Sequence, residues 1–357
     1  MKKVLIASSV LISGLLLAGC GTAPQSSSGN GTPSFALSQS LWRSDDGGAT
    51  WAVKNKGTGK ANASNVDVLS FAVDPTNGGH VYAGLRSGGI LETTDAGDTW
   101  KFINFQSGKV YGLAVDASGK TLYASGVWQG TGKMFKTTDD GANWKEIYTS
   151  PSSGPLVVSL MIDKHDSNVL YASTSDNQVI KSTDGGTSWR NVYQANSPVL
   201  KVAIDAGNSS LIYFITQSGL LYQSKDAGAT FQNMTDQINK SLKGSYGSRD
   251  FNVLTTDPTR AGMLYLAGEG GIVMSSDSGM TWKRIAALND TQNFPIKVLA
   301  IDPDNSNDLI YGSSQATYRS TNGGAAWTTS QFEGKLSVNA LAYNPQNPSI
   351  IYAGFTK

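Results

Sequence analysis

Short apolar runs alternate with turn-rich polar segments along the chain from residue 35 onward. Each unit has an apolar strand, then Asp or Asn in a turn, then a second strand that contains a tyrosine, as in AVDPTNGGHVYAG. Apolar runs of about four to eight residues bounded by Gly, Pro, Asn and Asp are typical of β-strands joined by tight turns. We expect the tyrosines of these units to pack between neighbouring repeats. The seven tyrosines are Tyr82, Tyr123, Tyr171, Tyr213, Tyr265, Tyr311 and Tyr352.

A second motif, Ser-x-Asp-x-Gly-x-Thr-Trp, alternates with the first, and we call it the clasp. Its Asp and its Ser or Thr can hydrogen-bond neighbouring amides, and its Gly supplies the positive φ of a tight turn. We therefore interpret the clasp as structural, not as catalytic or metal-binding. Its final aromatic residues lie 42 to 51 residues apart, a spacing typical of propeller blades. The acidic or amide position of the seven copies is Asp46, Asp95, Asp139, Asp184, Asp226, Asp277 and Asn322.

Together the two motifs predict an all-β fold, a seven-bladed β-propeller whose blades are four-stranded and antiparallel. The last repeat stops five residues after Tyr352, and the first one starts shortly before a clasp. We expect the N-terminal strands to pair with the C-terminal strands in one shared blade. Such pairing closes the ring and leaves no exposed sheet edge.

Composition narrows the possible functions. The 357 residues carry 28 basic and 27 acidic side chains, a formal charge of +1, so we expect no nucleic-acid partner. The sequence has two histidines and one cysteine, too few for the usual zinc sites, and we expect neither a metal nor a cofactor. No Gly-rich phosphate loop or nucleophile elbow is present in the sequence.

The N-terminal segment predicts export and a lipid anchor. Residues 1–19 have a basic start, an apolar run shorter than the roughly 20 residues of a membrane span, and a small-residue end before Cys20. This arrangement resembles a bacterial lipoprotein signal, which implies lipidation of Cys20. Residues 20–34 predict a flexible Gly/Ser/Pro tether, and residues 35–357 the propeller. We expect a monomer held on the outer face of the cell membrane or on the outer membrane of a bacterium.

The clasp is similar to the Asp-box, or bacterial neuraminidase repeat. Combined with the VYAG-type strands, it resembles the seven-bladed propellers of the sortilin type and of the photosystem II assembly factor type, and the repeats of xyloglucan-degrading glycoside hydrolases. The resemblance covers residues 35–357. It implies a propeller, but unrelated activities use the same blades.

We expect the binding face to be the one opposite the clasps, where the loops between the fourth and first strands and between the second and third strands lie. Two connections break the repeat there, residues 54–67 and 233–250. Trp128 lies outside the clasps, so the repeat does not account for it. Aromatic, basic and amide side chains on these loops suit a protein or carbohydrate ligand of the cell envelope. The candidate ligand-binding residues are Arg86, Trp128, Gln129, Lys243, Tyr246 and Arg249.

Two classes of function remain open. The preferred one is a binding or scaffold module that assembles envelope proteins or holds glycans. The alternative is a glycoside hydrolase of the xyloglucanase type, which needs two carboxylates across a cleft, and Asp250 and Glu269 are the weak candidates. A sialidase is a poorer fit, because only Arg86 and Arg249 lie on the expected face whereas sialidases are known for an arginine triad.

Overall fold

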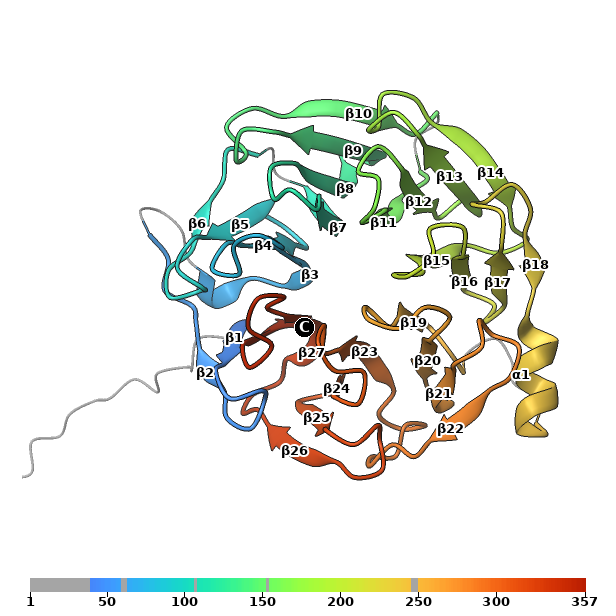
Figure 1. Ribbon diagram of the computed structural model, residues 1–357. Coiled ribbons are helices and arrows are strands. Elements are labelled where there is room, and N and C mark those ends of the chain that lie inside the picture. The colour runs from blue at the N-terminus through green and yellow to red at the C-terminus, as the bar shows by residue number, and fades with distance from the viewer. Residues whose placement is uncertain (1–38, 59–62, 106–107, 152–153, 245–249) are drawn as a thin grey trace, which may run out of the picture. The chain divides into compact units, whose positions relative to one another are not determined.

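A computed structural model describes residues 39–58, 63–105, 108–151, 154–244 and 250–357. These residues form seven four-stranded antiparallel sheets arranged as the blades of a propeller ring (Figure 1). Each blade starts at the centre of the ring and its later strands lie progressively further out, except in the blade that the two chain ends share. The predicted seven-bladed propeller is therefore confirmed.

The strands fall into four concentric sets. The innermost strands are β3 (Val68–Val73), β7 (Lys109–Val115), β11 (Val157–Ile162), β15 (Val199–Ile204), β19 (Val253–Thr256), β23 (Ile296–Ile301) and β27 (Ser337–Tyr343). The second strands are β4 (Val81–Leu85), β8 (Leu122–Trp128), β12 (Leu170–Thr174), β16 (Ile212–Thr216), β20 (Leu264–Gly268), β24 (Leu309–Ser313) and β28 (Ile351–Thr356). The third strands are β5 (Ile90–Thr93), β9 (Thr131–Thr137), β13 (Gln178–Ser182), β17 (Leu221–Ser224), β21 (Gly271–Ser275), β25 (Ala316–Ser320) and β1 (Leu41–Ser44). The outer strands are β6 (Lys101–Phe102), β10 (Lys145–Thr149), β14 (Arg190–Gln194), β18 (Gln232–Asn233), β22 (Lys283–Ile285), β26 (Thr328–Gln331) and β2 (Ala52–Val53).

The blade that the two chain ends share contains the predicted strands. Its strand order is β2-β1-β28-β27, so the N-terminal part supplies the two outer strands and the C-terminal part the two inner ones (Figure 1). β1 pairs with β28 in the register Leu41↔Gly354 to Ser44↔Ile351. The pairing joins the two ends of the described chain through main-chain hydrogen bonds, and the ring closes as expected.

The clasps are hydrogen-bonded turns. In the first copy, the Ser44 hydroxyl accepts the Gly48 amide at 2.6 Å, and Asp46 accepts both the Thr50 amide and its hydroxyl at 2.8 and 2.6 Å. Gly48 has φ +93°, a conformation that side-chain-bearing residues resist. Hydrogen bonds from Thr50 lower the pKa of Asp46 to about 2, so this carboxylate is an acceptor committed to the turn. The structural interpretation of the clasp agrees with this geometry.

The repeated tyrosines connect neighbouring blades. All seven are at most 2 % exposed. The Tyr171 hydroxyl donates to the carbonyl oxygen of Ala227, inside the clasp of the following blade, at 2.7 Å. The Tyr352 hydroxyl donates to the carbonyl oxygen of Gly78, which also lies in the following blade, at 3.4 Å. These contacts agree with the expected packing between repeats. Tyr311 differs from the other six, because it lies one residue further along its strand and its hydroxyl donates to Asn289 of the connection before its own blade.

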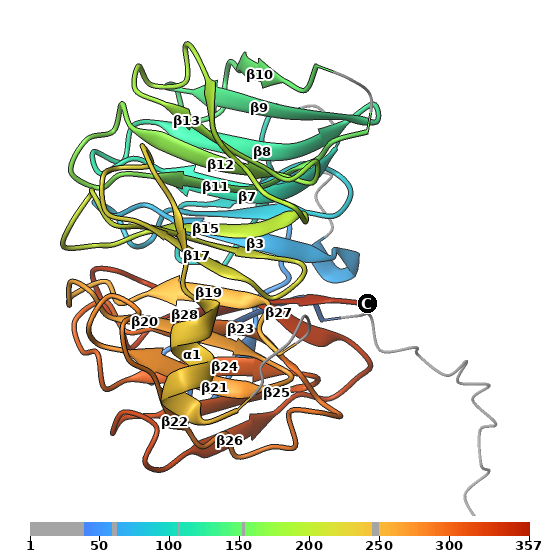
Figure 2. The same cartoon turned by 90° about the vertical axis from the view of Figure 1, so that its right-hand side faces the viewer.

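One of the two enlarged connections contains a helix. α1 (Thr235–Leu242) lies on the outer side of the ring beside β22 (Figures 1 and 2). It is held there because Met234 and Ile238 are buried in the cluster that contains Trp282. This connection is thus partly structural. The other connection contains the 3-10 turn η1 (Ala63–Asn65).

Removing the closing strand tests the ring. Deletion of residues 351–357 takes away β28, where Ile351, Tyr352, Ala353 and Phe355 are at most 1 % exposed. Each large apolar side chain of this kind contributes about 1.5–3 kcal/mol on burial. We expect the melting temperature, measured by circular dichroism, to fall by roughly 10 °C or more. Deletion of Lys357 alone is the control and should leave it unchanged; equal melting temperatures for both deletions would contradict closure through β28.

Candidate functional site

A cavity of about 400 Å³ occupies the centre of the ring and is lined by all seven innermost strands. Its exposed surface is more polar than apolar, and leucines such as Leu160, Leu254 and Leu341 complete the lining. Small-molecule sites typically have this size and combine apolar walls with a few convergent polar groups. We call this cavity the channel site.

A β-bulge recurs in the strands that line the channel site. The pairing between the innermost and second strands shifts register at the same place in six blades, and the register of β19 shows no such shift. A bulge adds one unpaired residue and re-aims its side chain. Here the residue before each bulge is a fully buried Val or Ile that anchors the strand. The bulged residues are Leu69, Tyr111, Val158, Leu200, Lys297 and Asn339.

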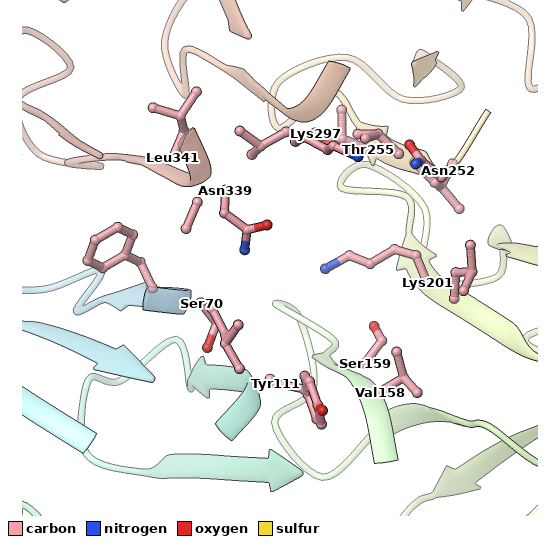
Figure 3. A pocket seen from close by; sticks show the side chains of 18 of the residues that line it. Ser70, Tyr111, Val158, Ser159, Lys201, Asn252, Thr255, Lys297, Asn339 and Leu341 are labelled. Atoms are coloured by element: carbon pink, nitrogen blue, oxygen red, sulfur yellow. The ribbon is translucent and has the colours of Figure 1, made fainter. Parts of the chain in front are cut away.

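Four polar side chains occupy one arc of the channel site, on four successive blades. They are Lys201 of β15, Asn252 just before β19, Lys297 of β23 and Asn339 of β27. Figure 3 shows Lys201 extending from its strand into the cavity. Hydroxyl groups of Ser70, Tyr111 and Ser159 belong to the other three blades.

The channel site is cationic. No Asp or Glu is among the residues that line it, and within the described residues neither lysine has an ion pair. Lys201 and Lys297 are both exposed to the space of the cavity. The surrounding protein disfavours the charged form of Lys201 and lowers its pKa below the usual value for lysine. The arrangement offers hydrogen-bond donors and positive charge to a ligand.

The opposite end of the channel differs in chemistry. A second cavity, of about 450 Å³, is lined by the ends of the innermost strands and by prolines of the turns that follow them. These prolines are Pro75, Pro258, Pro303 and Pro345. This end lies on the clasp side of the ring and carries no lysine, so the charge is confined to the other end.

A separate crevice of about 340 Å³ lies on the face opposite the clasps. Its walls come from the β24–β25 hairpin turn and from the connections before β23 and after β26. Phe294 and Tyr318 contribute aromatic rings, and Gln315 and Gln331 contribute amides. We call it the Phe294 crevice.

The connection that carries Phe294 is held in one shape by hydrogen bonds. The Asn289 amide nitrogen donates to the carbonyl oxygen of Phe294 at 2.8 Å and to the Ser313 hydroxyl at 3.0 Å. The Tyr311 hydroxyl donates to the Asn289 side-chain oxygen at 2.9 Å. In spite of this fixed backbone, Phe294 is 53 % exposed and Leu288 of the same connection 56 %. Two large apolar side chains are therefore presented to solvent by an ordered loop.

The structure places the predicted ligand-binding residues separately. Trp128 is 2 % exposed and packs edge-on against Phe105 and Phe135, with ring centroids 5.3 and 4.8 Å away. We therefore correct its assignment, because a buried ring offers no face to a ligand. Gln129 is exposed at the tip of the β8–β9 hairpin, with φ +52°.

The basic candidates are dispersed. Arg86 is half-exposed and its guanidinium lies 3.4 Å from the Asp67 carboxylate. Lys243 is exposed and caps the C-terminus of α1 with φ +51°. Tyr246, Arg249 and Cys20 lie outside the described residues. Arg86, Gln129 and Lys243 belong to three different blades or their connections, and none of them lines the channel site or the Phe294 crevice.

The two candidate catalytic carboxylates lie on adjacent segments of one blade. The Gly270 amide donates to the carbonyl oxygen of Asp250 at 2.9 Å, which joins the start of β19 to the hairpin turn that carries Glu269. The Glu269 carbonyl oxygen accepts the Thr291 hydroxyl at 2.9 Å. These main-chain contacts give both residues a role in holding the loops.

Among the residues described here, no cluster of three or more His, Cys, Asp or Glu side chains is placed to bind a metal ion. The described part of the chain also has no helix of sufficient length and apolarity to cross a membrane.

Residues of the channel site and of the Phe294 crevice stand out in the sequence, although the analysis of the repeated motifs did not identify them. Each lysine interrupts an otherwise apolar innermost strand, as VLKVAI and IKVLAI show. Phe294 lies outside the clasps and outside both repeated motifs. Departures from the repeat within strands, and not only long loops, mark the candidate sites.

Comparison with known proteins supports the fold. A family model described as Sortilin, neurotensin receptor 3 (Sortilin-Vps10) matches residues 132–245. None of the curated proteins compared with the sequence matches it.

Solved structures of similar fold include enzymes and a peptide complex. The GH74 xyloglucanase from Xanthomonas campestris is 18% identical over 81% of this chain and 51% of its own, with a TM-score of 0.66. The Niastella koreensis GH74 enzyme has the same identity and coverage and a TM-score of 0.64. The chain thus spans about half the length of these enzymes.

The structure of YCF48 bound to D1 peptide is 15% identical over 82% of this chain and 94% of its own, with a TM-score of 0.61. The predicted resemblance to sortilin-type, assembly-factor-type and xyloglucanase-type propellers is confirmed for the fold.

Substitution of Trp128 tests its assignment to the core. We expect Trp128→Ala to lower the free energy of unfolding by about 3–5 kcal/mol, because it leaves a cavity between Phe105 and Phe135. Gln129→Asn, at the adjacent exposed position, is the control and should change it by less than about 0.5 kcal/mol. Urea denaturation measures both. If Trp128→Ala is as stable as the Gln129→Asn control, Trp128 does not belong to the core and the correction of its assignment is wrong.

Proposed function

We propose that this propeller is a binding module that holds an extended segment of another protein in the Phe294 crevice. The observation that carries the proposal is the exposure of Leu288 and Phe294 on a hydrogen-bonded loop. Clustered apolar side chains on an ordered surface are typical of interaction sites. A rigid loop also loses little conformational entropy when a partner binds.

The crevice has the polar groups that a main chain needs. Ser314, Gln315 and Gln331 lie around the aromatic rings and can exchange hydrogen bonds with peptide amides and carbonyls. Aromatic anchors surrounded by polar groups are the usual arrangement of binding energy at protein interfaces.

An apolar protein side chain fits the site better than a sugar. The loop that supplies Phe294 to the crevice also exposes Leu288, an aliphatic side chain that suits an apolar residue of a partner and has no ring on which a sugar could stack. The similar structure of YCF48 solved with a D1 peptide provides an analogy, since the match covers 94% of that chain. That analogy supports a peptide ligand by fold alone.

The N-terminal segment indicates where the module would act. With Cys20 lipidated and residues 20–34 as a tether, the module would be exported and held at a bacterial membrane surface. Its partner would then be another protein of the cell envelope, for which the module acts as a scaffold or assembly factor.

Peptide selection tests the function. A random peptide library displayed on phage is selected against the full protein, and synthetic copies of the recovered peptides are titrated by fluorescence anisotropy. We expect the peptides to share a large apolar residue, and Phe294→Ala to weaken their binding by about tenfold or more. Phe102→Ala is the matched control, since Phe102 is 40 % exposed but lies on the outer strand β6, and it should bind as the unmodified protein does.

Two results would contradict the proposal. One is the absence of any selected peptide, or equal weakening by both substitutions. The other is release of reducing sugar from xyloglucan by the protein and its loss in Asp250→Asn/Glu269→Gln, which would establish the hydrolase alternative.

A further inference from the structure

The channel site contains charge that the propeller fold itself does not require. The position of Lys297 is occupied in other innermost strands by Leu69, Tyr111, Val158, Leu200 and Asn339. The position of Lys201 is occupied by Ser70, Gly112, Ser159, Val298 and Ala340. Because the same strand forms with uncharged residues at both positions, packing does not explain the lysines.

The two lysines have no counter-ion in the described part of the protein. Both residues are exposed to the space of the cavity, so their ammonium groups are available to a ligand there. No acidic side chain lines the cavity, and among the described residues no ion pair is formed by either lysine. Both positive charges line the same cavity, so an anion that enters it is attracted by both.

The neighbouring groups complement an anion. Asn252 and Asn339 lie in the same arc as the lysines, and each has an amide that can donate to an oxyanion. The hydroxyl groups of the other blades are less available, because Ser70 donates to the Val110 carbonyl oxygen and the buried Ser159 accepts the Val202 amide. The donors for an anion are therefore the lysines and asparagines of one arc, and carboxylates, which would repel an anion, are absent from the lining of this cavity.

We propose that the channel site binds a small doubly charged oxyanion, a phosphate or a dicarboxylate, between Lys201 and Lys297. Two ammonium groups match two negative charges, and charge-assisted hydrogen bonds to carboxylate or phosphate oxygens are stronger than neutral ones. A cavity of about 400 Å³ accommodates such a ligand. This site is separate from the Phe294 crevice and does not depend on the proposed function.

Calorimetric titration of the full protein tests the site. The probes are inorganic phosphate, succinate and, as a singly charged comparison, acetate, at pH 7 and constant ionic strength. We expect phosphate or succinate to bind one-to-one with a dissociation constant of about 1 mM or tighter, and acetate to bind at least about tenfold more weakly. Binding by phosphate alone identifies a phosphoryl ligand, and binding by succinate alone a dicarboxylate; each supports the site.

Charge-removing variants locate the binding. Lys201→Gln and Lys297→Gln should each weaken binding by about tenfold or more, and the double variant should abolish it. Lys335→Gln is the control, since Lys335 is exposed on a connection outside the cavity and is not among its lining residues. It should bind as the unmodified protein does.

Thermal unfolding shows whether a variant loses binding because the charge is missing or because the protein is destabilised. Without ligand, Lys201→Gln should melt at the same or a higher temperature, because an unpaired ammonium is removed. With ligand, the melting temperature should rise for the unmodified protein and for Lys335→Gln only. The proposal is overturned if neither dianion binds, or if Lys335→Gln loses as much affinity as the channel variants.

Discussion

The ring depends on the buried hydroxyl of each clasp, which accepts the amide of a glycine four residues later. In the blade formed by β15 to β18, the Ser224 hydroxyl accepts the Gly228 amide at 2.8 Å and thereby fixes the turn between β17 and β18. The same turn presents the Ala227 carbonyl to Tyr171 of the preceding blade. One small motif thus shapes a hairpin and provides the contact by which the neighbouring blade docks. Tyr123 makes a similar contact with the Gly185 carbonyl, and the pairing of β28 with β1 closes the ring.

The residues that stabilise the ring and the residues proposed to bind ligands lie in different parts of it. On the clasp side, the repeated clasp carboxylates, such as Asp46 and Asp184, already accept hydrogen bonds from the amides of their own turns. The opposite face and the innermost strands carry the residues that differ from blade to blade. Lys201 and Lys297 are inserted into strands that the rest of the blade already holds, and Phe294 lies on a loop fixed by Asn289. A scaffold with many equivalent contacts can tolerate such local departures.

The fold was predictable because its signals are local and repeated. Each clasp contains its own donors and acceptors, and the spacing of the tyrosines sets the blade length without knowledge of distant contacts. The candidate site was less accessible to prediction because it is assembled from different blades. Trp128 looked available since it lies outside the clasps, but Phe105 and Phe135 enclose it, and Gly108 permits the close approach of its ring. The convergence of two lysines from β15 and β23 is a consequence of the ring and not of neighbouring sequence.

The central claim is that the channel holds a positive charge without a protein counter-ion, ready for an anion. It is tested most directly by the pKa of Lys201, measured by NMR of protein labelled with ¹³C at the lysine ε-carbon and assigned with Lys201→Gln. The account predicts that Lys201 titrates below the usual lysine pKa of about 10.4 and that phosphate or succinate raises its pKa while leaving Lys335 unchanged. Titration of Lys201 together with the exposed lysines, with no response to either anion, would contradict it.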